Sequence, residues 1–453
     1  MVPYRVLVVD DSAFMRKIIS DLIIQDSQFK IVATAKNGHE AIEAVREWKP
    51  DVVTLDLEMP LMNGIDALQI IMKDHPTPVI MLSGISEDNT RETIKALQFG
   101  AFDFIRKPSA TISNDIRQVG EVLLEKLRIA VLTKRYQPVI TIAEKQETKA
   151  EDSSLPKAKK EVVSNNILHH EELPFEALST PAKDRNKLPF KKTEDKQGQQ
   201  RSVPPLHNKL TSNMQDEAKP NDAKSKIAPR KSVEKVPQAE PKSHFSEPPS
   251  TKKTKTVQTA STFKHIVAIG TSTGGPRALH EVITSLPADF PAPVLIVQHM
   301  PPKFTKSLAQ RLDSFSEIHV VEAEQGEKVV AGVAYIAPGG YHMELVKDAS
   351  SYSIALTEQP QRNGHRPSVD VLFESLAEYR ELKRHAVIMT GMGSDGAKGM
   401  KLLSECGIET TIAEAEETCV VYGMPRSAVE AGCVSKVLPL QHIASQLKQA
   451  VLK

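Results

Sequence analysis

Residues 265–276 read HIVAIGTSTGGP, and this stretch decides the fold of the second half of the chain. Its first five residues form an apolar run of the length of one buried strand, and its glycine-rich end leads into a helix-like stretch from Pro276. A buried strand followed directly by a helix is typical of a parallel α/β sheet. Ser272 lies between them in a Gly-x-Ser-x-Gly pattern, whose glycines allow a tight turn that exposes the hydroxyl.

Two other polar residues follow apolar strands in the same way. His299 comes directly after residues 294–298, and Asp395 follows residues 386–390 and a glycine-rich turn. Side chains at the carboxyl ends of parallel strands gather at one edge of the sheet. A serine hydroxyl is a weak nucleophile that needs a base and a group to orient that base. We therefore predict an acyl-transfer hydrolase in which Ser272 attacks, His299 takes its proton and Asp395 orients His299.

Each of these residues also has a plainer interpretation. Ser272 could be an ordinary turn serine, His299 a structural residue and Asp395 a helix N-cap. The convergence of all three on strand ends favours a triad. Their order along the chain, Ser-His-Asp, differs from the Ser-Asp-His order of α/β-hydrolases and argues against a lipase-like fold. The residue after the nucleophile, Thr273, is a candidate for the oxyanion hole through its backbone N–H.

The first 130 residues alternate short apolar runs with helical periodicity. This pattern predicts a doubly wound, five-stranded parallel sheet covered by helices on both faces. The expected strands are 5–9, 30–35, 51–55, 79–82 and 103–106, and the expected helices are 13–25, 38–48, 64–73, 86–99 and 113–130.

Polar residues follow these strands as well. Asp10 and Asp11 follow the first strand and Asp56 ends the third, so three carboxylates should meet at one edge. A divalent cation relieves their repulsion, and oxygen ligands suit Mg²⁺. Ser83 and Lys107, after the fourth and fifth strands, can bind phosphoryl oxygens. The sequence thus predicts a carboxylate that accepts a phosphoryl group.

Residues 131–262 differ from both flanks. They hold 13 of the 30 prolines in the chain and are rich in Lys, Ser, Gln, Asn and Glu. Such a segment has too few apolar side chains to offset the entropy of ordering its backbone, so we expect a long disordered linker.

Residues 263–453 should form a second α/β domain. We expect a Rossmann-like, mainly parallel sheet with an antiparallel hairpin at one end, turning at Pro338-Gly339-Gly340. The expected strands are 265–269, 294–298, 318–322, 333–337, 342–346, 352–357, 386–390 and 409–413.

Composition narrows the class of protein. The formal net charge is +1, and the excess positive charge lies in the proline-rich middle, so we expect no nucleic-acid binding. Three cysteines without a CxxC pair argue against disulfides and zinc, and we interpret Cys419 as a small buried residue rather than a nucleophile. With no signal peptide and no apolar run long enough to span a membrane, a cytoplasmic location is expected.

The first domain resembles response-regulator receiver domains. The likeness covers nearly all of residues 1–125 and rests on Asp10-Asp11, Asp56 with Met59-Pro60 and Gly64, Ser83 and Lys107-Pro108. The resemblance implies that a sensor histidine kinase phosphorylates Asp56. It also implies that Asp11, Asp56 and the backbone carbonyl of Glu58 bind Mg²⁺, with Asp10 acting indirectly. Ser83 and Lys107 would sense the phosphate, Phe104 would be the aromatic switch, and the Lys107–Pro108 bond would be cis.

The second domain resembles the chemotaxis protein-glutamate methylesterase family, CheB. The motifs that carry the likeness are residues 269–276, 298–301, 364–373, 390–397 and 420–425. The resemblance implies hydrolysis of glutamyl methyl esters on membrane chemoreceptors, with release of methanol, and deamidation of certain receptor glutamines, without a cofactor for the esterase. It adds the backbone N–H of Met392 as an oxyanion-hole candidate. Arg366 would either help to place the acidic receptor or form a salt bridge within the fold.

Two other classes of function stay open at this point. The second domain could be a non-enzymatic module that binds receptors or a nucleotide, although residues 270–275 lack the GxGxxG spacing. A transcription factor is less favoured, because the second domain shows no helix-turn-helix pattern. Intact Ser272, His299 and Asp395 favour a phosphorylation-activated esterase.

Overall fold

The computed structural model describes residues 2–84, 86–108, 113–133, 263–348 and 351–452. Apart from residues 131–133, the expected disordered linker lies outside these ranges. Within the described part of the chain, no helix is long and apolar enough to cross a membrane.

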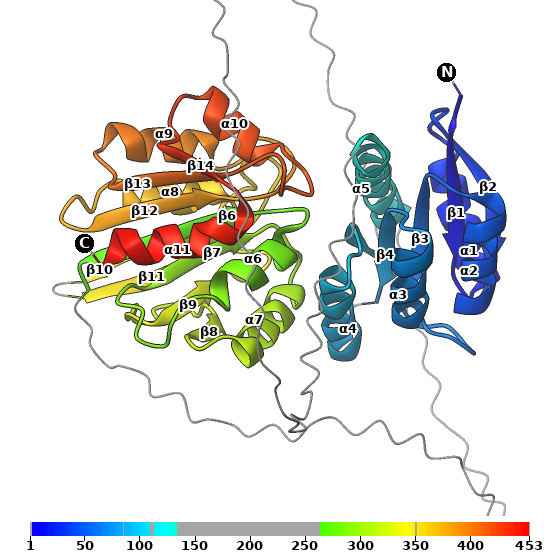
Figure 1. Ribbon diagram of the computed structural model, residues 1–453, viewed down its shortest axis with the longest axis horizontal. Helices are drawn as coiled ribbons and strands as arrows, with labels where there is room; N and C mark the ends of the chain where they lie inside the picture. The colour runs from blue at the N-terminus through cyan, green and yellow to red at the C-terminus, as the bar shows by residue number, and fades with distance from the viewer. Residues whose placement is uncertain (1, 85, 109–112, 134–262, 349–350, 453) are drawn as a thin grey trace, which may run out of the picture. The chain divides into compact units, whose positions relative to one another are not determined.

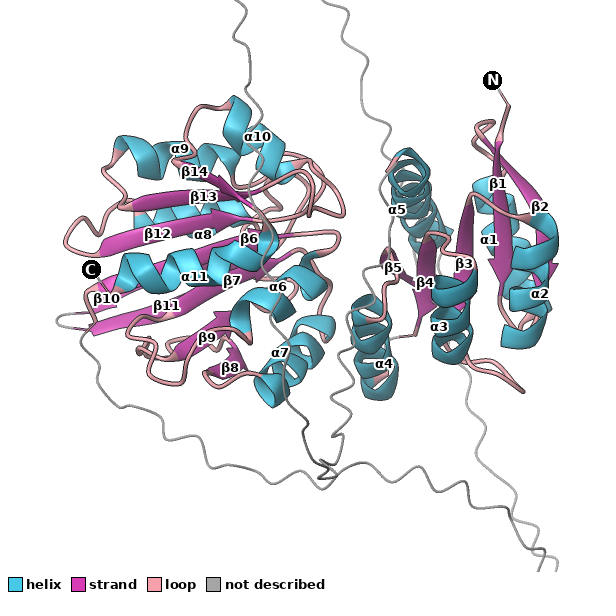
Figure 2. Ribbon diagram, in the orientation of Figure 1, coloured by secondary structure: helices cyan, strands magenta, loops and turns pink. Residues whose placement is uncertain are grey.

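The first domain is a five-stranded parallel sheet in the order β2-β1-β3-β4-β5, with helices on both faces (Figures 1 and 2). The predicted fold of this domain is confirmed. Its elements are β1 (Tyr4–Val9), α1 (Ala13–Ile23), β2 (Phe29–Ala35), α2 (Gly38–Trp48), β3 (Val52–Asp56), α3 (Gly64–Asp74), β4 (Val79–Ser83), α4 (Glu87–Gln98), β5 (Asp103–Arg106) and α5 (Ser113–Leu132).

Alternation of side chains along β1 explains the two helical layers. Val6 and Val8 point to one face and share a core with α1 and α5, whereas Leu7 and Val9 point to the other and share a core with α2, α3 and α4. All four valine and leucine side chains are fully buried. Such near-continuous burial is expected of a parallel sheet that is covered on both faces.

The second domain contains a seven-stranded parallel sheet in the order β14-β13-β12-β6-β7-β9-β8. A separate antiparallel pair, β10 and β11, packs with α8, α9 and α10 on one face, and α6, α7 and α11 cover the other (Figure 2). Its elements are β6 (His265–Thr271), α6 (Gly275–Ile283), β7 (Val294–Gln298), α7 (Phe304–Phe315), β8 (His319–Glu322), β9 (Val333–Ile336), β10 (His342–Asp348), β11 (Ser351–Thr357), α8 (Val369–Leu376), β12 (Lys383–Ile388), α9 (Ala397–Glu405), β13 (Thr410–Glu414), α10 (Met424–Glu430), β14 (Lys436–Leu438) and α11 (Leu440–Val451).

The hairpin exists, but its predicted turn was wrong. Residues 338–340 do not join two antiparallel strands, because β9 pairs in parallel with β7 and β8, whereas β10 pairs with no described strand other than β11. The glycines serve a close approach instead. A Cβ atom on Gly339 would lie 2.4 Å from the backbone of Pro301 and Pro302, in the loop after β7. The three-residue strand β14 was not predicted.

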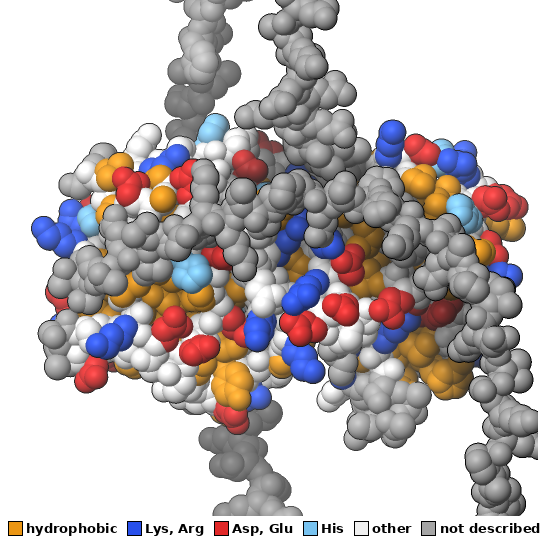
Figure 3. Space-filling model, turned by 90° about the horizontal axis from the view of Figure 1, so that it is seen from below, with side chains coloured by type: hydrophobic (Ala, Val, Ile, Leu, Met, Phe, Trp, Pro, Cys, Tyr) orange, Lys and Arg blue, Asp and Glu red, His pale blue; other side chains and the backbone are white. Residues whose placement is uncertain are grey.

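The order of the strands places a switch point in the middle of the sheet. After β6 the chain places β7, β8 and β9 on one side, in the spatial order β7-β9-β8, and later returns to place β12, β13 and β14 on the other. Loops after β6 and β12 therefore diverge and leave a crevice at their carboxyl ends, where ligands bind in open α/β sheets. Figure 3 shows acidic and basic side chains interspersed on one face of the molecule, without a single-sign field there.

Candidate active site and phosphoacceptor pocket

Hydrogen bonds to both neighbouring strands fix the Ser272 turn. The Ser272 N–H donates to the carbonyl of Thr390 after β12 at 3.0 Å, and the Ser272 carbonyl accepts from Gln298 Nε2, at the end of β7, at 2.9 Å. It also accepts from the N–H of Gly275 at 2.8 Å, which closes the turn into α6. The nucleophile candidate is therefore anchored at the switch point by strands on both sides.

Glycine is required at two positions of this turn. Gly274 has a φ of 82°, in the left-handed region that side chains disfavour. A Cβ atom on Gly275 would lie 1.9 Å from Oε1 of Gln298 and 2.7 Å from Oγ1 of Thr271. The pattern read from the sequence thus reflects both backbone conformation and lack of space.

His299, which follows β7, and Asp395, which follows β12, form a hydrogen-bonded pair. His299 Nε2 lies 2.8 Å from Asp395 Oδ2, and the two side chains are 5% and 1% exposed. The other ring nitrogen, Nδ1, is buried without a hydrogen-bond partner among the described residues. A neutral imidazole with its proton on Nε2 leaves a lone pair on Nδ1, so this nitrogen is free to act as a base.

Several donors surround the Asp395 carboxylate. Oδ1 accepts from Asn363 Nδ2 and Ser368 Oγ, each at 2.8 Å, and Oδ2 accepts from the N–H of Val369 at 2.7 Å. Burial alone would raise the pKa of Asp395, but the hydrogen bonds and charge of this shell outweigh it and hold the pKa below its usual value. Asp395 therefore stays an anion beside His299.

Sequence reasoning missed Asn363, Ser368 and Gln298. The sequence around Asn363 and Ser368 was informative, but it indicated other roles for these residues. Asn363-Gly364 is a turn dipeptide, and Ser368 is the N-cap of α8, accepting from the N–H of Val371. Nothing in the local sequence indicates that the side chains of Asn363 and Ser368 contact Asp395.

Two backbone N–H groups border Ser272. Those of Thr273 and Met392 donate to no recorded acceptor in the described ranges, as an oxyanion hole requires of its donors. Gly391 brings the second loop close, because a Cβ atom there would lie 2.8 Å from the Cβ of Ser272.

The structure also bears on the expectations for Arg366 and Cys419. Arg366 donates through Nη1 to the backbone carbonyls of Glu358 and Gln359, at 2.8 and 3.0 Å, so within the described residues the guanidinium fastens a loop and forms no salt bridge. Burial raises the pKa of the Cys419 thiol, with Glu414 adding to the effect. The thiol thus stays protonated and is a poor nucleophile.

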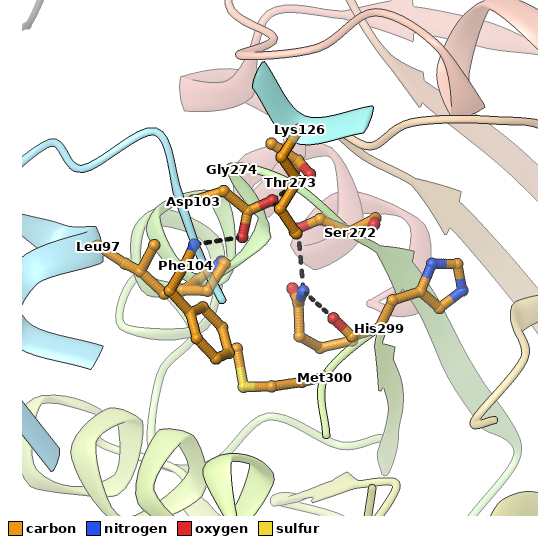
Figure 4. Close-up of a pocket in the computed structure, with 11 residues that line it drawn as sticks. Leu97, Asp103, Phe104, Lys126, Ser272, Thr273, Gly274, His299 and Met300 are labelled. Atoms are coloured by element: carbon orange, nitrogen blue, oxygen red, sulfur yellow. Dashed lines mark hydrogen bonds and ion pairs between the residues drawn. The ribbon is translucent and has the colours of Figure 1, made fainter. Parts of the chain in front are cut away.

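A small pocket brings Ser272 and His299 together with residues of the first domain (Figure 4). Both domains belong to one compact unit. Thr273 Oγ1 donates to Asp103 Oδ2 at 2.6 Å, and Asp103 also pairs with Lys126 of α5. The Phe104 ring stacks on Phe304 of α7, with centroids 4.6 Å apart and planes 29° apart.

More polar contacts accompany this pocket. Thr90 Oγ1 and Ser307 Oγ lie 2.6 Å apart and are buried, and Arg311 Nε donates to Gln98 Oε1 at 2.9 Å. These contacts join α4 of the first domain to α7 of the second.

The acidic residues of the first domain converge as predicted. Carboxylate oxygens of Asp10, Asp11 and Asp56 all lie within 4.8 Å of one another. Lys107 Nζ lies 2.8 Å from Asp10 Oδ2 and 2.7 Å from Asp56 Oδ2. Burial raises the pKa of Asp56 to about 6, with Lys107 opposing the shift and Asp10 adding to it. Three crowded oxygen donors with a carboxylate that resists ionisation fit a divalent cation such as Mg²⁺.

The remaining predicted residues lie around this cluster. Ser83 is fully buried, accepts from Thr93 Oγ1 at 2.6 Å and donates to the Gly84 carbonyl at 2.9 Å. Phe104 is 6% exposed. The expected cis bond at Lys107–Pro108 was wrong: in the described part of the chain the cis bond is Arg366–Pro367.

Two family models match the chain. A CheB methylesterase model matches residues 267–447, and a response regulator receiver domain model matches residues 6–117. These ranges coincide with the two α/β domains.

Relatives match over nearly the full length. A protein-glutamate methylesterase/protein-glutamine glutaminase of Geobacillus kaustophilus is 40% identical over 447 residues, covering 99% of this chain and 98% of the relative. A protein of the same name from Bacillus subtilis is 37% identical over 450 residues, covering 99% of each. The crystal structure of the Thermotoga maritima CheB methylesterase catalytic domain is 49% identical, covers 42% of this chain and 100% of that chain, and has a TM-score of 0.41. Because full-length relatives are 37% and 40% identical and both family models match, the chain belongs to the CheB methylesterase family and carries a receiver domain ahead of its methylesterase domain.

Proposed function

We propose that this chain is a phosphorylation-activated protein-glutamate methylesterase that also deamidates glutamines, and that Ser272, His299 and Asp395 form its triad. Its substrates are glutamyl methyl esters and glutamines on membrane chemoreceptors. The observation that carries the proposal is the buried His299–Asp395 pair beside Ser272, with the free Nδ1 of His299 as the base.

The chemistry proceeds in two balanced halves. Ser272 Oγ gives its proton to His299 Nδ1 and bonds to the ester carbonyl carbon, whose oxygen becomes an anion between the N–H groups of Thr273 and Met392. The methoxy group leaves with the proton from His299 as methanol, and an acyl-Ser272 remains. Water then attacks the acyl carbon while His299 takes one of its protons; the bond from that carbon to Ser272 Oγ breaks, Oγ takes the proton back from His299, and a glutamate is released. In deamidation the first leaving group is ammonia.

The direct test is release of methanol from methylated receptor fragments. Ser272→Ala should reduce it to background while thermal unfolding stays unchanged. Ser285→Ala is the control, because this exposed hydroxyl just after α6 donates to the carbonyl of Glu281. A Ser272→Ala variant with full turnover contradicts the triad. A wild-type chain that binds the receptor without turnover favours the non-enzymatic alternative.

Regulation rests on the receiver residues that border the pocket. We propose that the unphosphorylated receiver restricts the triad and that a phosphoryl group on Asp56 relieves the restriction. The Thr273–Asp103 hydrogen bond and the Phe104–Phe304 stack support this proposal, because they connect the receiver to the nucleophile turn and to α7. Asp11, Asp56 and the Glu58 carbonyl would hold the Mg²⁺, with Asp10 assisting; the ion would neutralise charge on the incoming phosphoryl group. Ser83 and Lys107 would contact that group.

A small phosphodonor replaces the histidine kinase in the test. Acetyl phosphate with Mg²⁺ should stimulate methanol release by the wild-type chain and should leave Asp56→Asn at its basal rate. Equal stimulation of both proteins would contradict the assignment of Asp56, without bearing on the triad.

A further inference from the structure

The mechanism leaves unused a second histidine that lies flat against the base. The rings of His299 and His365 are stacked with centroids 3.7 Å apart and planes 10° apart. The separation of these centroids is the shortest among the ring pairs of the described residues. His299 is thus held in its plane by Asp395 and across its face by His365.

A tight turn presents the His365 ring. Arg362 and His365 exchange two backbone hydrogen bonds of 3.0 and 2.9 Å, and the two residues between them have φ of 53° (Asn363) and 81° (Gly364). Two successive positive φ angles are typical of a type I′ turn, for which Asn-Gly is the preferred pair.

The turn is fastened to the same carboxylate that orients the base. Asn363 Nδ2 donates to both Asp395 Oδ1 and Asp370 Oδ2 at 2.8 Å, and Arg362 pairs with Glu374 of α8 at 2.7 Å. One short segment therefore positions the Asp395 carboxylate through Asn363 and covers the His299 ring with His365.

The charge state of His365 suits this position. Burial lowers its pKa to about 4; the charges of His299 and Lys126 add to this and that of Asp395 opposes it. At neutral pH the His365 ring is consequently uncharged. A neutral aromatic face attracts a cation, and in the proposed mechanism His299 becomes a cation when it takes the proton of Ser272. The attraction is then stronger in the transition state than in the ground state, which is the condition for an effect on kcat.

We infer that His365 is a positioning residue for the base: its stacked ring fixes the plane of His299 and stabilises the imidazolium that forms during acyl transfer. The inference rests on the proposed function, since it needs His299 to act as the base.

The experiment, in the full-length chain, tests whether residue 365 must carry an aromatic ring or only apolar volume. His365→Phe keeps a flat ring, whereas His365→Leu keeps apolar volume without one. His319→Phe is the control, because His319 lies on β8 and contacts Asp313. For each protein we would measure kcat and KM for methanol release, the rate at which a fluorophosphonate labels Ser272, and thermal unfolding.

We expect His365→Phe to stay within about threefold of the wild type. His365→Leu should lose about tenfold in kcat, with KM unchanged, and about tenfold in the labelling rate, as a loss of roughly one cation–π contact predicts. If His365→Leu unfolds at a lower temperature, His365→Gln should show the same loss in labelling at a temperature where it is fully folded.

Equal losses in the Phe and Leu variants, or a loss confined to KM, would overturn the role of His365. A wild-type chain that neither releases methanol nor labels at Ser272 would instead overturn the proposed function, so the two failures are distinguishable.

Discussion

Thr273, the residue directly after the nucleophile candidate, donates its hydroxyl proton to Asp103 of the receiver across 2.6 Å. The backbone N–H of Thr273 is an oxyanion-hole candidate. A receiver carboxylate therefore holds the side chain of a residue whose backbone must face the substrate.

Removing that carboxylate should raise basal activity. We expect Asp103→Ala to increase methanol release without phosphodonor by about fivefold, because one buried hydrogen bond contributes about 1 kcal/mol. Asp26→Ala is a matched control, since Asp26 also pairs with a basic residue of α5, Arg128, but has no contact with Thr273. A basal rate equal to that of the control would show that the contact does not restrain the site.

Gly391→Ala should damage the nucleophile. Its Cβ would lie 2.4 Å from Met424 Sδ and 2.8 Å from Ser272 Cβ, so one of them must move. A displacement of about 1 Å can lower kcat about 100-fold. Gly407→Ala is the control: its φ of 77° is strained, but nothing lies within 4 Å. That variant should lose about 1 kcal/mol of stability and keep its kcat. A fully active Gly391→Ala would mean that the loop yields without moving Ser272.

Asn363→Gly removes one donor from Asp395 without straining the turn, since glycine adopts a φ of 53° freely. We expect kcat to fall about tenfold, because a hydrogen bond to a charged group contributes about 1.5–3 kcal/mol and other donors partly replace it. Lys49→Gly, at another left-handed position in the receiver (φ 44°), should not change kcat. If both variants behave alike in steady-state kinetics, the Asn363 donor has no part in catalysis.

A second stacked pair of histidines should make stability depend on pH. His265 Nδ1, at the start of β6, and His385 Nε2, on the neighbouring strand β12, lie 3.0 Å apart, and both side chains are buried. Burial lowers the pKa of His385 to about 4, with His265 and Lys383 adding to the shift. It also lowers the pKa of His265, where Lys383 and Lys264 add to the shift and Glu409 opposes it.

The direction of this pH dependence follows from proton binding. Between the usual histidine pKa of about 6.5 and the lowered value, the unfolded chain binds a proton that the native chain does not, so stability falls as pH falls. From about pH 7 to about pH 5, His385 should cost the second domain about 2 kcal/mol in free energy of unfolding. His385→Phe should remove most of that slope in denaturant titrations, while His442→Phe, an exposed control on α11, should keep it. Parallel slopes in both variants would place the pH dependence elsewhere.

Strand ends were the predictable part of the site. Ser272, His299, Asp395 and the Asp10–Asp56–Lys107 cluster follow apolar runs, and parallel strands bring such positions together whatever the details of packing. The contacts of Asn363 and His365 were not predictable, because they lie in a turn whose place depends on where α8 packs. The glycines at 339 and 340 misled for a related reason. Glycine marks a tight turn and a close backbone approach alike, and only tertiary structure distinguishes them.

The placement of β12 beside β6 has a consequence for how the chain folds during its synthesis. Ser272 and His299 are synthesised early in the second domain, on strands that can pair as soon as both exist, whereas Asp395 follows a strand that must insert later on the other side of β6. Such long-range pairing is slow to form. A nascent or truncated chain can therefore hold nucleophile and base together while the carboxylate that orients the base is still missing. For the proposed triad this means that His299 acquires its orienting carboxylate only after β12 has paired with β6.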